Sequence, residues 1–133
     1  MNLGRVYSAL KMYPDAEDCY RLAIEKNPYI VQIYSSLTEF YFSQGAYEKA
    51  LEPLEQALKI DSSSAEIYNM LGIAYDGTNR FKEAEDAFKR ALQKKPDFEI
   101  VYLNLAHFYH KIGEGEKSRM FLKMAETIRE PGR

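Results

Sequence analysis

Apolar residues in this chain recur at steps of three and four positions within short segments, the spacing of one face of an α-helix. In residues 65–77 the stripe comprises Ile67, Tyr68, Leu71, Ala74 and Tyr75. In residues 81–93 it comprises Ala84, Ala87, Phe88, Ala91 and Leu92. The turn-forming residues 76–79 end the first segment and Pro96 follows the second, so the pattern predicts two helices joined by a short turn.

The two-helix pattern returns every 34 residues without an insertion. The matching positions are Tyr34, Leu37, Tyr41, Ala50, Leu54 and Ala57, then Tyr68, Leu71, Tyr75, Ala84, Phe88 and Ala91, then Tyr102, Leu105, Tyr109, Ser118, Leu122 and Ala125. The same phase at the start of the chain falls on Leu3, Gly4, Tyr7, Ala16, Tyr20 and Ala23. We therefore read residues 1–133 as a single domain of four repeats, 1–30, 31–64, 65–98 and 99–132, of which the first lacks its opening turn.

Small residues keep fixed places in the repeat, which predicts how its helices pack. Gly4 and Gly72 share one phase of the first helix, and alanines hold two phases of the second. Helices that cross closely need small side chains where their backbones approach, and a single pair buries too little apolar surface to be stable alone. We therefore expect an all-α fold, an α-solenoid in which about eight antiparallel helices form a right-handed superhelix. Gly45 and Gly113 suit left-handed turn residues, and residues 61–64 supply N-caps.

The pattern resembles the tetratricopeptide repeat (TPR). The third repeat carries every family position, namely Tyr68, Leu71, Gly72, Tyr75, Ala84, Phe88, Ala91 and Pro96. Elsewhere Thr38 and Ala106 replace the glycine, Ser118 replaces an alanine, and Gly115 replaces the turn aromatic, so we expect the last helix to fray most easily. The resemblance implies a protein–protein interaction scaffold that binds a peptide or helix of a partner in a concave groove lined by the first helices.

Residues off the core stripe of each first helix would face this groove. The candidate groove residues are Gln32, Ser35, Glu39, Phe42, Glu66, Asn69, Met70, Ile73, Leu103, Asn104 and His107. They mix adaptable apolar side chains with amides that can hold a ligand's backbone, which predicts an extended or helical apolar segment as the ligand. The alternative for Ile73 and Ile100 is that they are half-buried between neighbouring first helices.

One subset of the family grips the terminal carboxylate of chaperone tails with Lys, Arg and Asn at fixed groove phases. In this chain those phases fall on Met1, Arg5, Ser36, Glu66 and Met70 in one frame and on Ser35, Glu39, Met70, Ile100 and Asn104 in the other. Neither set is a cationic clamp, because Glu39 and Glu66 would repel a carboxylate. We therefore do not expect a chaperone-tail receptor.

Composition argues against several other functions. The 18 Lys and Arg and 20 Asp and Glu give a net charge of −2, which offers no reason for a nucleic-acid partner. No long apolar stretch or signal-peptide core occurs, so we expect no membrane span and a cytoplasmic location. Cys19 is the single cysteine, which rules out an internal disulfide. No nucleotide-binding or catalytic motif occurs, so we expect no enzyme activity and no cofactor.

We interpret two groups of ionisable residues, a histidine pair and a carboxylate cluster, as structural and not as functional sites. His107 and His110 lie three residues apart, a spacing that can bind a metal, but further ligands are not evident, so we expect no metal site. A hydrogen bond between Asp76 and His110, which have equivalent phases, is the preferred reading. Asp15, Glu17 and Asp18 are read as solvated carboxylates that complement a helix dipole.

The last helix carries an apolar ridge formed by Met120, Phe121, Met124 and Ile128. Earlier repeats have polar residues at the phases of the two methionines, namely Glu52, Gln56, Asp86 and Arg90. The ridge either tucks against its own repeat or packs against another copy or a following segment. The second reading gives another hypothesis, a self-assembling module and homo-oligomer joined through this helix. Met1 falls inside the first helix by phase, which indicates either a fragment that lacks upstream residues or a very compact member of the family.

Overall fold

The protein is described by a computed structural model, which covers residues 13–130, with side chains from Ala16 onward. These residues form seven α-helices and no strand, which confirms the all-α prediction. The first helix of the first repeat was predicted within residues 1–12 and lies outside the described residues. The chain divides into two compact units, 1–63 and 64–133, and we describe each by itself.

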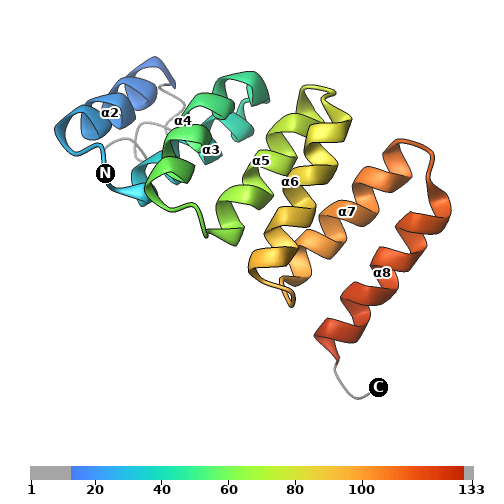
Figure 1. Cartoon of the computed structure of the whole chain (residues 1–133). Helices are drawn as coiled ribbons and strands as arrows, with labels where there is room; N and C mark the ends of the chain where they lie inside the picture. The colour runs from blue at the N-terminus through green and yellow to red at the C-terminus, as the bar shows by residue number, and fades with distance from the viewer. Residues whose placement is uncertain (1–12, 131–133) are drawn as a thin grey trace. The chain divides into compact units, whose positions relative to one another are not determined.

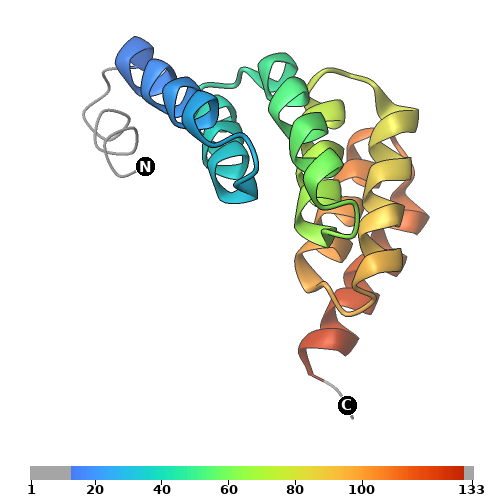
Figure 2. The same cartoon turned by 60° about the vertical axis from the view of Figure 1, so that its left-hand side comes forward.

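The first unit contains α2 (Tyr13–Lys26), α3 (Val31–Ser43) and α4 (Tyr47–Ile60), and α3 packs against both of the others. The second unit contains α5 (Ala65–Gly77), α6 (Phe81–Lys94), α7 (Glu99–Lys111) and α8 (Gly115–Arg129). Within it, successive helices pack side by side and run antiparallel, as Figures 1 and 2 show. The helices predicted at 65–77 and 81–93 are α5 and α6, the latter one residue longer.

The turn inside each of the last three repeats has the same geometry. Gly45 and Gly113 have φ angles of 70° and 85°, as predicted, and Asn79 occupies the equivalent place with φ of 63°. Asparagine is one of the few residues besides glycine that visits this left-handed region readily. Ser64 is the N-cap of α5, where its hydroxyl accepts a hydrogen bond of 3.3 Å from the backbone N–H of Ile67. The cap predicted in residues 61–64 is therefore confirmed.

The small residues lie where the helices of a pair approach each other. Ala50, Ala84 and Ala91 are fully buried. A Cβ atom added to Gly72 of α5 would lie 2.5 Å from the ring of Phe88 on α6, closer than any side chain tolerates. The glycine at this phase therefore allows the aromatic ring to pack directly on the backbone of the first helix.

A tyrosine–glutamate hydrogen bond joins neighbouring repeats in each unit. The hydroxyl of Tyr41 on α3 donates to Glu17 on α2, and the hydroxyl of Tyr109 on α7 donates to Glu85 on α6. Tyr41 also accepts a hydrogen bond of 2.8 Å from Arg21. The interpretation of Glu17 as a merely solvated carboxylate is wrong, because its side chain is used to bind the next repeat.

We predict that these two tyrosine–glutamate hydrogen bonds are lost in alkaline solution. Burial and the hydrogen bond to Glu17 raise the pKa of Tyr41 to about 12, and burial and Glu85 raise the pKa of Tyr109. Because the folded state holds these protons more tightly, the contribution to stability is complete below about pH 10, the ordinary pKa of tyrosine. This contribution is lost as the pH rises through about 12, the pKa of Tyr41 in the folded protein.

An alkaline titration that follows tyrosinate absorbance and far-UV circular dichroism together measures this effect. The Tyr41→Phe and Tyr109→Phe variants should each lose one late-titrating phenol and show a smaller fall in stability at high pH. If both variants titrate like the wild-type protein, the assignment of the two raised pKa values is wrong.

Candidate functional site

The first helices of the second unit, α5 and α7, lie next to each other and share two polar links. The amide nitrogen of Asn104 donates to the side-chain oxygen of Asn69 over 2.8 Å. The ammonium of Lys111 lies 3.0 Å from the carboxylate of Asp76. Each link joins residues 35 positions apart, so α7 is set against α5 in a single register. The links hold the two helices that carry most of the predicted groove residues.

We call the side of these helices that carries the predicted groove residues the α5–α7 surface, which is defined by Glu66, Asn69, Met70, Ile73, Leu103, Asn104 and His107. Glu66 and His107 are exposed, and Met70, Ile73, Leu103 and Asn104 are half-buried. Asn69 is only 8 % exposed. Ile73 is thus half-buried, as the alternative interpretation proposed, whereas Ile100 is exposed. The surface combines accessible apolar atoms with an amide pair.

The amide pair can bind a ligand without losing its internal hydrogen bond. Two asparagine side chains together offer four N–H donors and two carbonyl oxygens. The bond between Asn104 and Asn69 uses one donor and one oxygen. The remaining donors and acceptors suit the alternating N–H and C=O groups of a peptide backbone.

The other predicted groove residues belong to the first unit. Gln32 and Glu39 on α3 are exposed, and Ser35 is half-buried. Phe42 is half-buried, and its ring centroid lies 5.5 Å from that of Tyr47 at the start of α4. Phe42 therefore packs within its own repeat and offers only part of its ring to a ligand.

The predicted hydrogen bond between Asp76 and His110 is wrong, because Asp76 pairs with Lys111. The register of 35 residues between α5 and α7 brings Lys111, and not the residue of equivalent repeat phase, to the carboxylate. Both histidines are exposed. In residues 13–130, no group of three or more side chains is placed to hold a metal ion.

Models of one family match the chain over most of its length. Tetratricopeptide repeat models match residues 1–29 and 65–98, and a TPR repeat model matches residues 39–77. The chain belongs to the tetratricopeptide repeat family. The helix pair α7 and α8 lies in the range that the 34-residue period predicts as a fourth repeat.

Solved structures of proteins named MamA have the same fold as this TPR chain. A crystal structure of MamA superposes with a TM-score of 0.84 at 26 % identity and covers 99 % of this chain and 77 % of that one. Another has a TM-score of 0.84 at 25 % identity, covering 97 % and 70 %. MamA from Desulfovibrio magneticus RS-1, from residue 41 to its end, has a TM-score of 0.85 at 17 % identity, covering 99 % and 75 %.

No curated protein sequence matches this TPR chain significantly. Among its described helices there is no apolar stretch of the length that a membrane-spanning segment requires.

The last helix of the TPR chain leaves a core position open to solvent. Leu54 and Phe88, at one phase of the second helix, are 0 % and 2 % exposed, but Leu122 at the same phase of α8 is 47 % exposed. Leu122 lines a hollow of about 430 Å³ on α7 and α8 together with Leu103, Arg119 and Lys123, so Leu103 faces α8 as well as belonging to the predicted groove set. Sequence reasoning missed Leu122 as a candidate contact residue, although its phase marks it as a residue that a following helix would cover.

The predicted apolar ridge of α8 divides between two environments. The ring of Phe121 stacks on Tyr109 with centroids 5.4 Å apart and lies 6.2 Å from Tyr102, so it packs against its own repeat. Ile128 is half-buried, whereas Met120 and Met124 are exposed. We call the pair of Met120 and Met124, which lie one helical turn apart on one face of α8, the terminal surface; Leu122 lies on a different face of the helix. Phe121 therefore tucks against its own repeat, whereas Met120 and Met124 remain open to solvent.

Proposed function

We propose that this TPR protein is an interaction scaffold whose α5–α7 surface binds an extended or helical segment of a partner protein. Membership of the TPR family, whose arrays are typically scaffolds and not enzymes, supports this class of function. The observation that carries the site is the Asn69–Asn104 pair, together with half-buried Met70, which follows Asn69 on α5.

The chemistry of the surface favours a neutral or apolar ligand segment. Met70 is flexible and polarisable and can adapt to varied apolar side chains. Glu66 adds negative charge to this surface, which disfavours an acidic tail. The interface of one such segment is small, so we expect an affinity on the order of micromolar.

We predict that Met70→Glu abolishes the capture of groove ligands. The half-buried thioether would be replaced by a charge that loses solvation when the ligand covers it, weakening binding by about tenfold or more. The intact chain is immobilised and exposed to a lysate of its source cells, and the affinity of each captured protein is measured by calorimetry.

Leu22→Glu is the control, since it introduces the same charge at an exposed apolar residue on α2 that belongs to neither proposed surface. It should capture the same proteins as the wild-type chain. A folded Met70→Glu variant that binds those proteins with unchanged affinity would refute the assignment of the ligand to the α5–α7 surface.

A second candidate function is self-assembly through the terminal surface, which the exposure of Met120 and Met124 on one face of α8 favours. Exposed apolar groups that adjoin one another gain free energy when a second surface covers them. We predict that light scattering detects concentration-dependent oligomers and that Met124→Lys shifts the equilibrium towards monomers. A wild-type chain that is monomeric at high concentration and unaffected by Met124→Lys would count against this function.

A further inference from the structure

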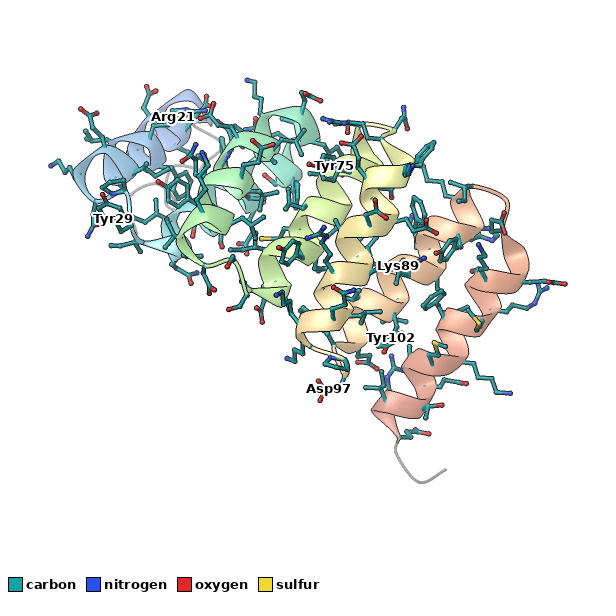
Figure 3. All side chains as sticks on the ribbon, viewed as in Figure 1. Arg21, Tyr29, Tyr75, Lys89, Asp97 and Tyr102 are labelled. Carbon is teal, nitrogen blue, oxygen red and sulfur yellow. The ribbon has the colours of Figure 1, made fainter. Side chains whose placement is uncertain are left out.

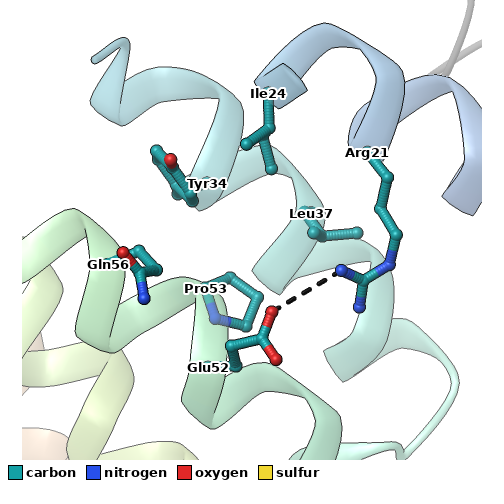
Figure 4. A pocket seen from close by; sticks show the side chains of 7 residues that line it. All are labelled: Arg21, Ile24, Tyr34, Leu37, Glu52, Pro53 and Gln56. Atoms are coloured by element: carbon teal, nitrogen blue, oxygen red, sulfur yellow. Dashed lines mark ion pairs between the residues drawn. The ribbon is translucent and has the colours of Figure 1, made fainter. Parts of the chain in front are cut away.

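A hollow of about 260 Å³ lies in the first unit among α2, α3 and α4, as Figure 4 shows. Its walls are formed by Arg21 and Ile24 of α2, Tyr34 and Leu37 of α3, and Glu52, Pro53 and Gln56 of α4. Arg21 and Glu52 form an ion pair of 3.6 Å beside it. None of these residues belongs to the α5–α7 surface or the terminal surface, so the hollow is a separate candidate site.

The wall of the hollow contains a tyrosine ring held in place by its own hydroxyl group. The hydroxyl of Tyr34 donates to the backbone oxygen of Pro28 over 2.8 Å. Two repeats later, Tyr102 donates to the backbone oxygen of Pro96 over 2.7 Å. The second unit therefore repeats this tyrosine wall and provides an internal comparison for the hollow.

In the second unit an aromatic ring lies against the equivalent tyrosine. Phe121 of α8 has the repeat phase of Pro53, and its ring lies 6.2 Å from that of Tyr102. Figure 3 shows the side chains of Lys89 and Tyr102, the counterparts of Arg21 and Tyr34, between the ribbons of α6 and α8. The first unit thus has a proline where the second unit has a phenyl ring.

The size of the hollow matches a missing ring. Proline is shorter than phenylalanine and interrupts the hydrogen-bond ladder within α4. An engineered apolar cavity of roughly 150 Å³ is large enough to bind benzene. The hollow, at about 260 Å³, can therefore accept one aromatic ring between Leu37 and Pro53.

We propose that this hollow binds an aromatic side chain of a partner protein, placed against Tyr34 as Phe121 is placed against Tyr102. Two polar residues that line the hollow determine which aromatic side chain it prefers. Glu52 and Gln56 occupy the phases of Met120 and Met124, so polar acceptors replace thioethers there. A tyrosine, whose hydroxyl group can donate to these acceptors, is favoured over phenylalanine.

The test follows the methyl groups of Ile24 and Leu37 by NMR in the full chain during titration with N-acetyl-tyrosine amide. We expect saturable shifts of both methyl groups, with a dissociation constant on the order of millimolar for a single side chain. N-acetyl-leucine amide should bind at least fivefold more weakly. Absence of shifts at both residues, or equal affinity for the leucine probe, would overturn the proposal.

Two substitutions of Pro53 distinguish the effect of the empty volume on binding from the effect of the proline side chain. Pro53→Phe fills the space and should reduce the shift of Leu37 at least fivefold, whereas Pro53→Ala keeps the space and should bind like the wild-type chain. Ile24→Phe, which fills the hollow from α2, serves the same purpose if Pro53→Phe does not fold. Unchanged binding in a folded variant with a filled hollow would overturn the site.

A capped glycine–tyrosine–glycine peptide tests whether the ring can come from a protein. Binding at least as tight as that of the tyrosine amide supports a protein source, because flanking peptide bonds are then tolerated. Exclusion of the peptide while the amide still binds would contradict a protein partner and assign the hollow to small free aromatic molecules.

Discussion

Phe88→Ala is expected to lower the free energy of unfolding by about 3–5 kcal/mol, the range for deleting a buried aromatic ring from a packed core. Phe88 is 2 % exposed, and its ring lies 6.3 Å from that of Phe108 on the next repeat. The ring also covers the backbone at Gly72. Its loss would remove contacts of α6 with both α5 and α7 at once. Urea denaturation followed by circular dichroism measures the change.

The repeat supplies a matched control for this prediction. Leu122 has the same phase as Phe88 but is 47 % exposed, so Leu122→Ala should cost less than about 1 kcal/mol. A similar cost for both substitutions would show that burial at this phase does not determine stability. A cost below about 1 kcal/mol for Phe88→Ala would contradict the packing of α6 described above.

Gly72→Ala is expected to destabilise the protein by about 1–2 kcal/mol, although alanine is the better helix former by about 1 kcal/mol. The added Cβ would lie 2.5 Å from the ring of Phe88, which is 2 % exposed and packs on Phe108. The cost of overpacking therefore exceeds the gain in helix propensity. Thermal and urea unfolding of the single variant measure the net effect.

A double-mutant cycle tests whether Phe88 causes this cost. In each repeat, the residue at the phase of Gly72 and the residue at the phase of Phe88 vary together in size. The pairs are Gly4 with Tyr20, Thr38 with Leu54, Gly72 with Phe88 and Ala106 with Leu122. Glycine accompanies a ring, and a larger residue accompanies leucine. In a Phe88→Leu background, Gly72→Ala should therefore be neutral or stabilising. Additive effects of the two substitutions would refute the proposed contact.

The candidate functional site was only partly predictable from the sequence. The repeat phase correctly separated core residues such as Leu71 and Leu105 from the less buried Met70 and Leu103. It did not predict that Asn69 is almost buried and bonded to Asn104, or that Lys111 takes the place assigned to His110. Both differences come from the register of 35 residues between α5 and α7, which the repeat length alone does not determine.

The sequence by itself determined the local architecture: the helix pairs, the left-handed turns at Gly45 and Gly113, and the small residue at Gly72. These features depend on spacing within a few residues or on a repeat that returns unchanged, so they can be read along the chain. Only the tertiary structure decided which polar groups meet, which core phase stays exposed at Leu122, and that Pro53 leaves a hollow where Phe121 supplies a ring. Those outcomes depend on how side chains from different helices share space, which position along one helix does not specify.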